Sequence, residues 1–213
     1  MFAARIYQEE WSVNARLAEL FGVTRDELIR VVREVVGARA DAVDNDPINA
    51  AGQFAYIHGV RNVRALFGTK GWHNIRKDNI ELTKHPEHLL MVGYQSVDLA
   101  ASESHIPQAI SGKGAGAERV ISEAQGDFFS LLDVNPPVQS PALANTGLWL
   151  LCVSVVGDDV RAELSLSSGV ASGNFEGFIE RIFLVKKGDW DELIVKTPDT
   201  SDAVDFEPVV IRK

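Results

Sequence analysis

The sequence predicts an α+β fold, with a helical N-terminal region, a mixed middle, and a C-terminal antiparallel sheet of about four strands against which one helix packs. Three observations predict this class. Apolar residues recur at helical spacing in the first third of the chain, and they alternate with polar residues in the last third. Segments rich in glycine and proline separate the two patterns. We expect a helical region at 1–68 and an α+β region at 69–213, or one domain over 1–213.

Three helices are expected in the first 68 residues. The first covers 13–21 and ends at Gly22, which suits the left-handed conformation at a helix C-terminus. Thr24 begins the second, and Glu27 three residues later completes the pattern of a capping box. The third covers about 47–67 and starts with a proline, a residue favoured in the first helical turn.

The middle of the chain mixes short extended segments with loops. Extended pieces are expected at 73–75 and 79–83, and a short strand at 89–92. A helix is expected over 117–132, where apolar residues return to helical spacing. The segment 133–147 contains three prolines and is the best linker candidate in the chain.

Four strands in two hairpins are expected in the last third. The first hairpin joins an apolar run at 148–156 to an alternating segment at 160–167, and the second joins 178–186 to 192–196. Apolar residues on one side of the alternating segment and polar residues on the other indicate a sheet with one covered face. An exposed edge of this sheet would suit self-association or a partner strand.

Composition excludes several classes of protein. The 213-residue chain is 46% hydrophobic and 24% charged, which is typical of a globular protein. It has no run of about 18 apolar residues that would predict a membrane span, and its first residues lack the apolar core of a signal peptide. The single cysteine, Cys152, excludes an internal disulfide framework and a multi-cysteine zinc site. We therefore expect a cytoplasmic protein. The excess of Arg over Lys suggests a GC-rich microbial source.

The charge of the chain is unevenly distributed. The formal net charge is −9, which would repel nucleic acid and anionic membranes if it were spread evenly. However, the 31 residues of 47–77 contain no Asp or Glu and carry a charge of +5, which leaves −14 on the rest of the chain. We call 47–77 the basic segment, and it is the strongest binding signal in the sequence.

The basic segment combines cations with aromatic residues, which suits an anionic partner. Cations bind phosphate or carboxylate groups, and exposed aromatic rings stack on bases. Arg61 and Arg64 lie three residues apart and so share one face of the third helix. The predicted contact residues are Arg61, Arg64, Lys70, Trp72, Arg76 and Lys77. In the alternative interpretation, the aromatic residues belong to the core and the cations pair with the acidic remainder.

The segment 17–30 resembles a helix-turn-helix, a motif whose second helix reads DNA through its N-terminal residues. In this sequence those residues include Asp26 and Glu27, whose charges oppose contact with phosphate. The same pattern is common in structural helix pairs, which is the interpretation we favour.

A glycine-rich loop precedes the helix expected at 117–132. Its residues Gly112, Lys113, Gly114 and Gly116 would place backbone N–H groups and one cation at a helix N-terminus, an arrangement that binds phosphate. The glycine spacing matches neither a P-loop nor a dinucleotide fingerprint. A flexible loop closed by the start of a helix is the simpler interpretation.

Other candidate chemistry is sparse. His85 and His88 are three residues apart, but the intervening proline favours a turn over a metal site. Ser102, Ser104 and His105 are close in sequence, but such closeness does not make a catalytic triad, and no nucleophile-elbow motif is present. We expect no metal site and no cofactor.

The leading hypothesis is a non-catalytic binding or regulatory protein whose basic segment contacts nucleic acid or an acidic protein. One alternative is an enzyme that acts on a nucleotide or phosphorylated substrate near the loop 112–116. The other is an interaction subunit of a larger assembly, or a homo-oligomer, held together by the C-terminal sheet.

Overall fold

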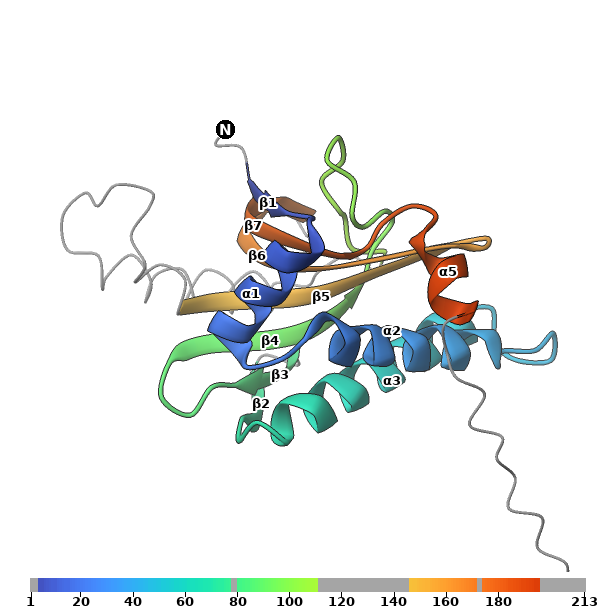
Figure 1. Ribbon diagram of the computed structural model, residues 1–213. Coiled ribbons are helices and arrows are strands. Elements are labelled where there is room, and N and C mark those ends of the chain that lie inside the picture. The colour runs from blue at the N-terminus through green and yellow to red at the C-terminus, as the bar shows by residue number, and fades with distance from the viewer. Residues whose placement is uncertain (1–3, 78–79, 111–145, 172–173, 196–213) are drawn as a thin grey trace, which may run out of the picture.

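The fold is organised around one central mixed sheet (Figure 1). The computed structural model describes residues 4–77, 80–110, 146–171 and 174–195. In these residues seven strands pair in the order β1-β7-β6-β5-β4-β3-β2, with β1–β7 and β4–β5 parallel and the other pairs antiparallel. The strands are β1 (Arg5–Tyr7), β2 (His73–Lys77), β3 (Ile80–Lys84), β4 (Leu89–Ser96), β5 (Thr146–Val156), β6 (Asp159–Ala171) and β7 (Asn174–Val185).

The α+β class is confirmed, but the expected C-terminal antiparallel sheet of about four strands is wrong. The strands β5, β6 and β7 do pair antiparallel, yet the sheet continues on both sides through strands from earlier in the chain. Two of its pairs are parallel, and parallel partners are joined by long connections that a local alternation pattern does not reveal. The C-terminal strands are consequently interior, and the two edges of the described sheet are β1 and β2.

Three long helices cover one face of the sheet: α1 (Glu10–Phe21), α2 (Arg25–Ala40) and α3 (Ala50–Gly68) (Figure 1). Their buried residues form one core with inward-facing residues of β4, β5, β6 and β7. The division of the chain at residue 68 stays a prediction, but this core is shared by both of its proposed parts.

Local signals at the first two helices are confirmed. Gly22 has a φ of 63°, and its N–H donates to the Ala18 carbonyl, as expected for the residue that ends α1. The Thr24 side chain accepts from the Glu27 N–H while the Glu27 carboxylate accepts from the Thr24 N–H, so the capping box is present. The third helix begins at Ala50, three residues later than expected.

A glycine lets α3 approach the sheet closely. Gly59 is buried, and a Cβ atom built on it would lie 2.5 Å from the ring of Tyr94 on β4. Glycine lowers helix propensity by about 1 kcal/mol relative to alanine. In α3 this glycine instead makes room for the Tyr94 ring of β4.

The second face of the sheet is also covered, contrary to the expectation of a single covered face. On β6 the apolar residues face the helices, while Glu163, Ser165 and Ser167 on the opposite side are buried as well. The segment 97–110 lies over this side and contributes Val97 and Ala100 to a second apolar cluster. Strand alternation separates the two faces but does not say what covers each of them.

The last described element corrects another prediction. The segment expected as a strand at 192–196 belongs to helix α5 (Asp189–Val195), so the second hairpin does not form. Acidic residues in the first turn stabilise a helix through its dipole, and Asp189, Asp191 and Glu192 occupy that turn. Trp190 anchors α5 in the core beneath the helices.

Candidate functional site

The basic segment forms α3, the turn that follows it, and edge strand β2. Its larger aromatic residues are structural. Trp72 is 5% exposed and packs against Phe67 and Phe21, with ring centroids 4.7 and 6.2 Å apart. The contact of Trp72 with a partner stays a prediction, but its ring fills the core between α1 and α3 and offers little surface for stacking. Tyr56 is the aromatic residue of the segment that stays accessible, at 43% exposed.

Several cations of the segment have acidic partners, as the alternative interpretation anticipated. The Lys70 ammonium lies 3.0 Å from a Glu27 carboxylate oxygen. Arg64 and Arg76 both donate to the Glu81 carboxylate, Arg64 from α3 and Arg76 from β2. These pairs tie the basic segment to α2 and β3.

The remaining predicted cations differ in environment. Arg61 is exposed, and no ion pair holds it among the described residues. Arg76 is 70% exposed despite its contact with Glu81. The backbone of Lys77 pairs in β2, but the position of its side chain lies outside the described part of the chain.

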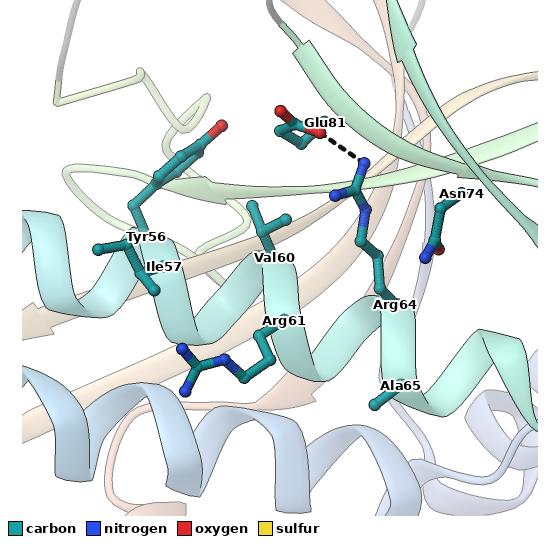
Figure 2. Close-up of a pocket in the computed structure, with 8 residues that line it drawn as sticks. All are labelled: Tyr56, Ile57, Val60, Arg61, Arg64, Ala65, Asn74 and Glu81. Atoms are coloured by element: carbon teal, nitrogen blue, oxygen red, sulfur yellow. Dashed lines mark hydrogen bonds and ion pairs between the residues drawn. The ribbon is translucent and has the colours of Figure 1, made fainter.

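A pocket of about 580 Å³ lies between α3 and the hairpin of β2 and β3 (Figure 2). Its apolar floor comes from α3, where residues three or four positions apart share one helix face. Its polar groups come from both elements. The lining residues are Tyr56, Ile57, Val60, Arg61, Arg64, Ala65, Asn74 and Glu81. This pocket is the candidate site, and we call it the α3–β2 pocket.

The α3–β2 pocket is rich in hydrogen-bond donors. Arg64 donates from Nη2 to the Ile75 carbonyl and to Glu81, and its buried Nε has no acceptor among the described residues. Figure 2 shows Arg64 reaching toward Glu81, whereas Arg61 points away from that carboxylate. A guanidinium group has five donors, so much of the donor capacity of the two arginines remains unused.

The protonation states around the pocket leave it net positive. Burial would raise the pKa of Glu81, but hydrogen bonds from Arg76 and Arg64 outweigh that effect and hold its pKa below the usual value. Burial, followed by the nearby Glu81 charge, raises the pKa of Tyr56 above 10. At neutral pH the pocket lining therefore contains one carboxylate, a neutral phenol and two arginines, and Arg76 lies beside it as the second partner of Glu81.

Strand β2 adds backbone groups beside the pocket. Among the described strands it pairs with β3 alone, so its outer side is an edge of the sheet. Arg76 lies opposite Glu81 in the register, which puts Arg76 on the pocket side of the hairpin. Edge strands bind extended peptides through main-chain hydrogen bonds, while adjacent pockets select side chains.

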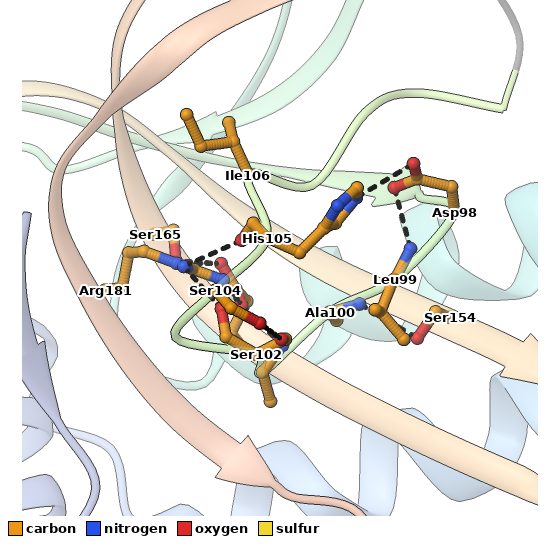
Figure 3. A network of polar contacts seen from close by, with 12 residues as sticks. Asp98, Leu99, Ala100, Ser102, Ser104, His105, Ile106, Ser154, Ser165 and Arg181 are labelled. Atoms are coloured by element: carbon orange, nitrogen blue, oxygen red, sulfur yellow. Dashed lines mark hydrogen bonds and ion pairs between the residues drawn. The ribbon is translucent and has the colours of Figure 1, made fainter.

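A second polar cluster lies on the opposite face of the sheet (Figure 3). Arg181 on β7 and Glu163 on β6 form a buried ion pair. Glu163 also accepts from the Ala101 N–H, and Arg181 donates to the carbonyls of Ser102 and His105. This network holds the segment 97–110 against the sheet. Sequence reasoning missed it because Glu163 alternates with apolar residues, as a solvent-facing residue does, and nothing near Arg181 indicates its partner.

The same segment contains a serine, histidine and aspartate combination without catalytic geometry. The His105 Nε2 lies 2.9 Å from Asp98, and the Ser102 and Ser104 hydroxyls lie 3.3 Å apart. In the described residues neither hydroxyl contacts the imidazole, as a nucleophile would contact its base. Asp98 instead accepts from the N–H groups of Leu99 and Gln108, which shapes the loop.

The other motifs have structural contacts or lie outside the described residues. Two of the first residues of α2 have contacts within the chain, since Arg25 donates to the Leu184 carbonyl and Glu27 pairs with Lys70, which argues against contact with DNA. The His85 Nδ1 accepts two backbone N–H groups of its own turn. The glycine-rich loop (Gly112, Lys113, Gly114, Gly116), the expected helix 117–132 and nearly all of the linker candidate lie outside the described residues.

A helix that spans a membrane must be both long and apolar. In the part of the chain that the structure describes, no helix is long and apolar enough to span a membrane. The chain was compared with protein-family models, with curated proteins and with solved structures, and none of the three comparisons gave a match.

Proposed function

We propose that this protein is a non-catalytic binding protein whose α3–β2 pocket accepts an acidic segment of a partner protein. The observation that carries the proposal is that Arg61 and Arg64 line a pocket with an apolar floor, while Arg76 lies beside it on edge strand β2 and contacts the Glu81 of its wall. Arginine recognises carboxylates through charge-assisted, often bidentate hydrogen bonds. Binding of such a segment requires no reaction and no cofactor.

The chemistry expected of the partner follows from the polar groups of the pocket and from its apolar floor. A carboxylate meets the exposed Arg61 and the accessible part of the Arg64 guanidinium, and an apolar side chain of the same segment covers Ile57, which is 48% exposed. Apolar burial contributes about 25 cal/mol per Å² removed from water. Charge-assisted hydrogen bonds contribute about 1.5–3 kcal/mol each.

An acidic protein suits this pocket better than nucleic acid does. The Glu81 carboxylate lies in the pocket wall and would oppose a phosphate chain, whereas a peptide's N–H groups can donate to it. Tyr56 is the one aromatic lining residue, so the described pocket offers little area for stacking bases. The −14 charge on the rest of the chain repels the long phosphate chain of a nucleic acid more strongly than a short segment with a few carboxylates.

Fluorescence anisotropy with labelled probes tests the proposal. The probes are a 12-residue peptide with four Asp or Glu and one Phe, its Asn and Gln counterpart, and a 20-nucleotide single strand of DNA. We expect the acidic peptide to bind most tightly, and Arg61→Ala combined with Arg76→Ala to weaken it about tenfold or more, since arginines are frequent hot spots. Binding should weaken as salt increases.

The control is Lys187→Ala, an exposed cation after β7, at the other side of the strand order. It should leave the affinity unchanged. Equal loss in the control and in the double variant would overturn the proposal, as would the absence of any binding of the acidic peptide at low salt. Preferential binding of the DNA strand would replace it with the nucleic-acid hypothesis.

A further inference from the structure

The chain contains a segment of its own with the chemistry that the α3–β2 pocket suits. After α5, the nine residues 199–207 read Asp-Thr-Ser-Asp-Ala-Val-Asp-Phe-Glu and contain four acids, one aromatic residue and no cation. We call them the acidic tail segment, which lies outside the described residues. Its carboxylates match the arginines of the pocket, and its phenylalanine matches the apolar floor.

The described structure fixes where this tail starts. Arg33 on α2 donates to the carbonyl of Leu193, so the end of α5 lies against α2. Glu27 near the start of α2 pairs with Lys70 just after α3, so these two packed helices run antiparallel. Six residues along α2 from Glu27 lead to Arg33, and six residues back along α3 from Lys70 lead to Arg64.

The tail consequently starts at the same position along the axes of α2 and α3 as the pocket. The lateral distance between them is about one helix diameter. Packed helix axes are roughly 8–10 Å apart. An extended chain covers about 3.3 Å per residue, so the 11 residues from 195 to 206 can span roughly 36 Å. The acidic tail segment can therefore reach Arg61 and the apolar floor of the pocket.

We propose that the acidic tail segment docks in the α3–β2 pocket of its own chain and competes with the partner. Its carboxylates pair with Arg61 and Arg76, and Phe206 covers the apolar floor. The inference rests on the proposed function of the pocket and adds self-inhibition to it. A tethered ligand has an effective concentration of about millimolar, so even a weak contact in cis reduces the affinity for an external ligand.

A full-length neutral-tail variant tests the inference: Asp199→Asn, Asp202→Asn, Asp205→Asn and Glu207→Gln. With the acidic 12-residue peptide as probe, we expect it to bind roughly tenfold more tightly than the wild type. A synthetic peptide of residues 198–211 should bind the neutral-tail variant, and Arg61→Ala with Arg76→Ala should abolish that binding.

The matched control changes four exposed carboxylates elsewhere: Glu9→Gln, Asp44→Asn, Glu103→Gln and Asp158→Asn. It makes the same change in net charge and should bind the probe like the wild type. A gain in affinity equal to that of the neutral-tail variant would overturn the inference, since it would show a general charge effect.

The remaining outcomes separate self-inhibition from the proposed function. If the wild type binds the probe through Arg61 and Arg76 but the neutral-tail variant binds no more tightly, self-inhibition is wrong and the pocket's function stands. If no acidic peptide binds any variant, both are wrong. If inhibition of the wild type increases with protein concentration, the tail acts on a second copy, and docking in cis is overturned.

Discussion

Arg181 donates from Nε and Nη2 to the two carboxylate oxygens of Glu163, at 2.9 and 2.6 Å, in a site where the residues are 3% and 0% exposed. The two residues come from neighbouring strands and meet on the face of the sheet opposite α1, α2 and α3. Besides each other, their side chains form hydrogen bonds with Ser165 and with the segment 97–110. The pair thus connects the sheet to the segment that covers it.

Removing one partner of this pair should strongly destabilise the protein. Glu163→Gln leaves the Arg181 charge buried without a counter-ion, which typically costs about 3–5 kcal/mol. Urea unfolding followed by circular dichroism measures the change. The control is Arg161→Ala, which breaks a pair between Arg161 and Asp159 nearer the surface and should cost about 1 kcal/mol or less. Equal losses would show that the buried pair has no special role.

Gly59→Ala should destabilise α3 against the sheet even though alanine favours helix. The new Cβ atom would lie 2.5 Å from the Tyr94 ring, and overpacking of this kind costs about 1–3 kcal/mol. Gly52→Ala in the same helix is the matched control. Nothing lies within 4 Å of the Cβ atom there, so we expect a gain of about 0.5–1 kcal/mol in the unfolding free energy. Changes of the same sign in both variants would contradict the packing argument.

The contribution of Glu81 to stability should depend on pH. Its folded-state pKa is lowered, so its contribution is fully present above the unfolded-state pKa of about 4.3 and is lost as the pH falls through the folded-state value. The unfolding free energies of the wild type and Glu81→Gln should differ most near pH 7 and converge below pH 4. A difference that stays constant down to about pH 2.5 would contradict the pairing with Arg64 and Arg76.

Asp98 should control the order of the segment that covers the second face. Its carboxylate accepts from the N–H groups of Leu99 and Gln108 and contacts His105. Asp98→Ala removes all three interactions, so we expect amide hydrogen exchange at Leu99 and Gln108 to accelerate at least tenfold, equivalent to about 1.4 kcal/mol. Exchange at Leu164 in the middle of β6 serves as the internal control and should change little.

Much of the local structure could be predicted from sequence because its causes are local. The capping box of Thr24 and Glu27 and the left-handed Gly22 need only their neighbours to form. The apolar run and the alternating segment that became β5 and β6 were predicted on the same basis. The segment 192–196 is an exception, since it was expected as the second strand of a hairpin while the acids at its start and before it begin a helix.

The relationships between distant segments could not be predicted. Nothing near β4 indicates that it pairs in parallel with β5, and nothing near Glu163 indicates that the segment 97–110 covers it. At the candidate site, the sequence identified Arg61, Arg64 and Arg76 as a group. It missed Glu81, which follows the basic segment and lies between Arg64 and Arg76 in the fold. A single sequence shows which charges are near each other along the chain, but not which of them are neutralised.

The parallel pairing of β1 with β7 has a consequence for biosynthesis. Residues 5–7 leave the ribosome long before their partners at 180–182, which are made about 175 residues later. Until then β1 has no strand beside it, because β7 is its only partner among the described strands. A nascent chain stopped before about residue 185 therefore exposes the core face of α1 and α2 to solvent, where chaperones and proteases act. Synthesis of β7 therefore decides whether β1 joins this sheet.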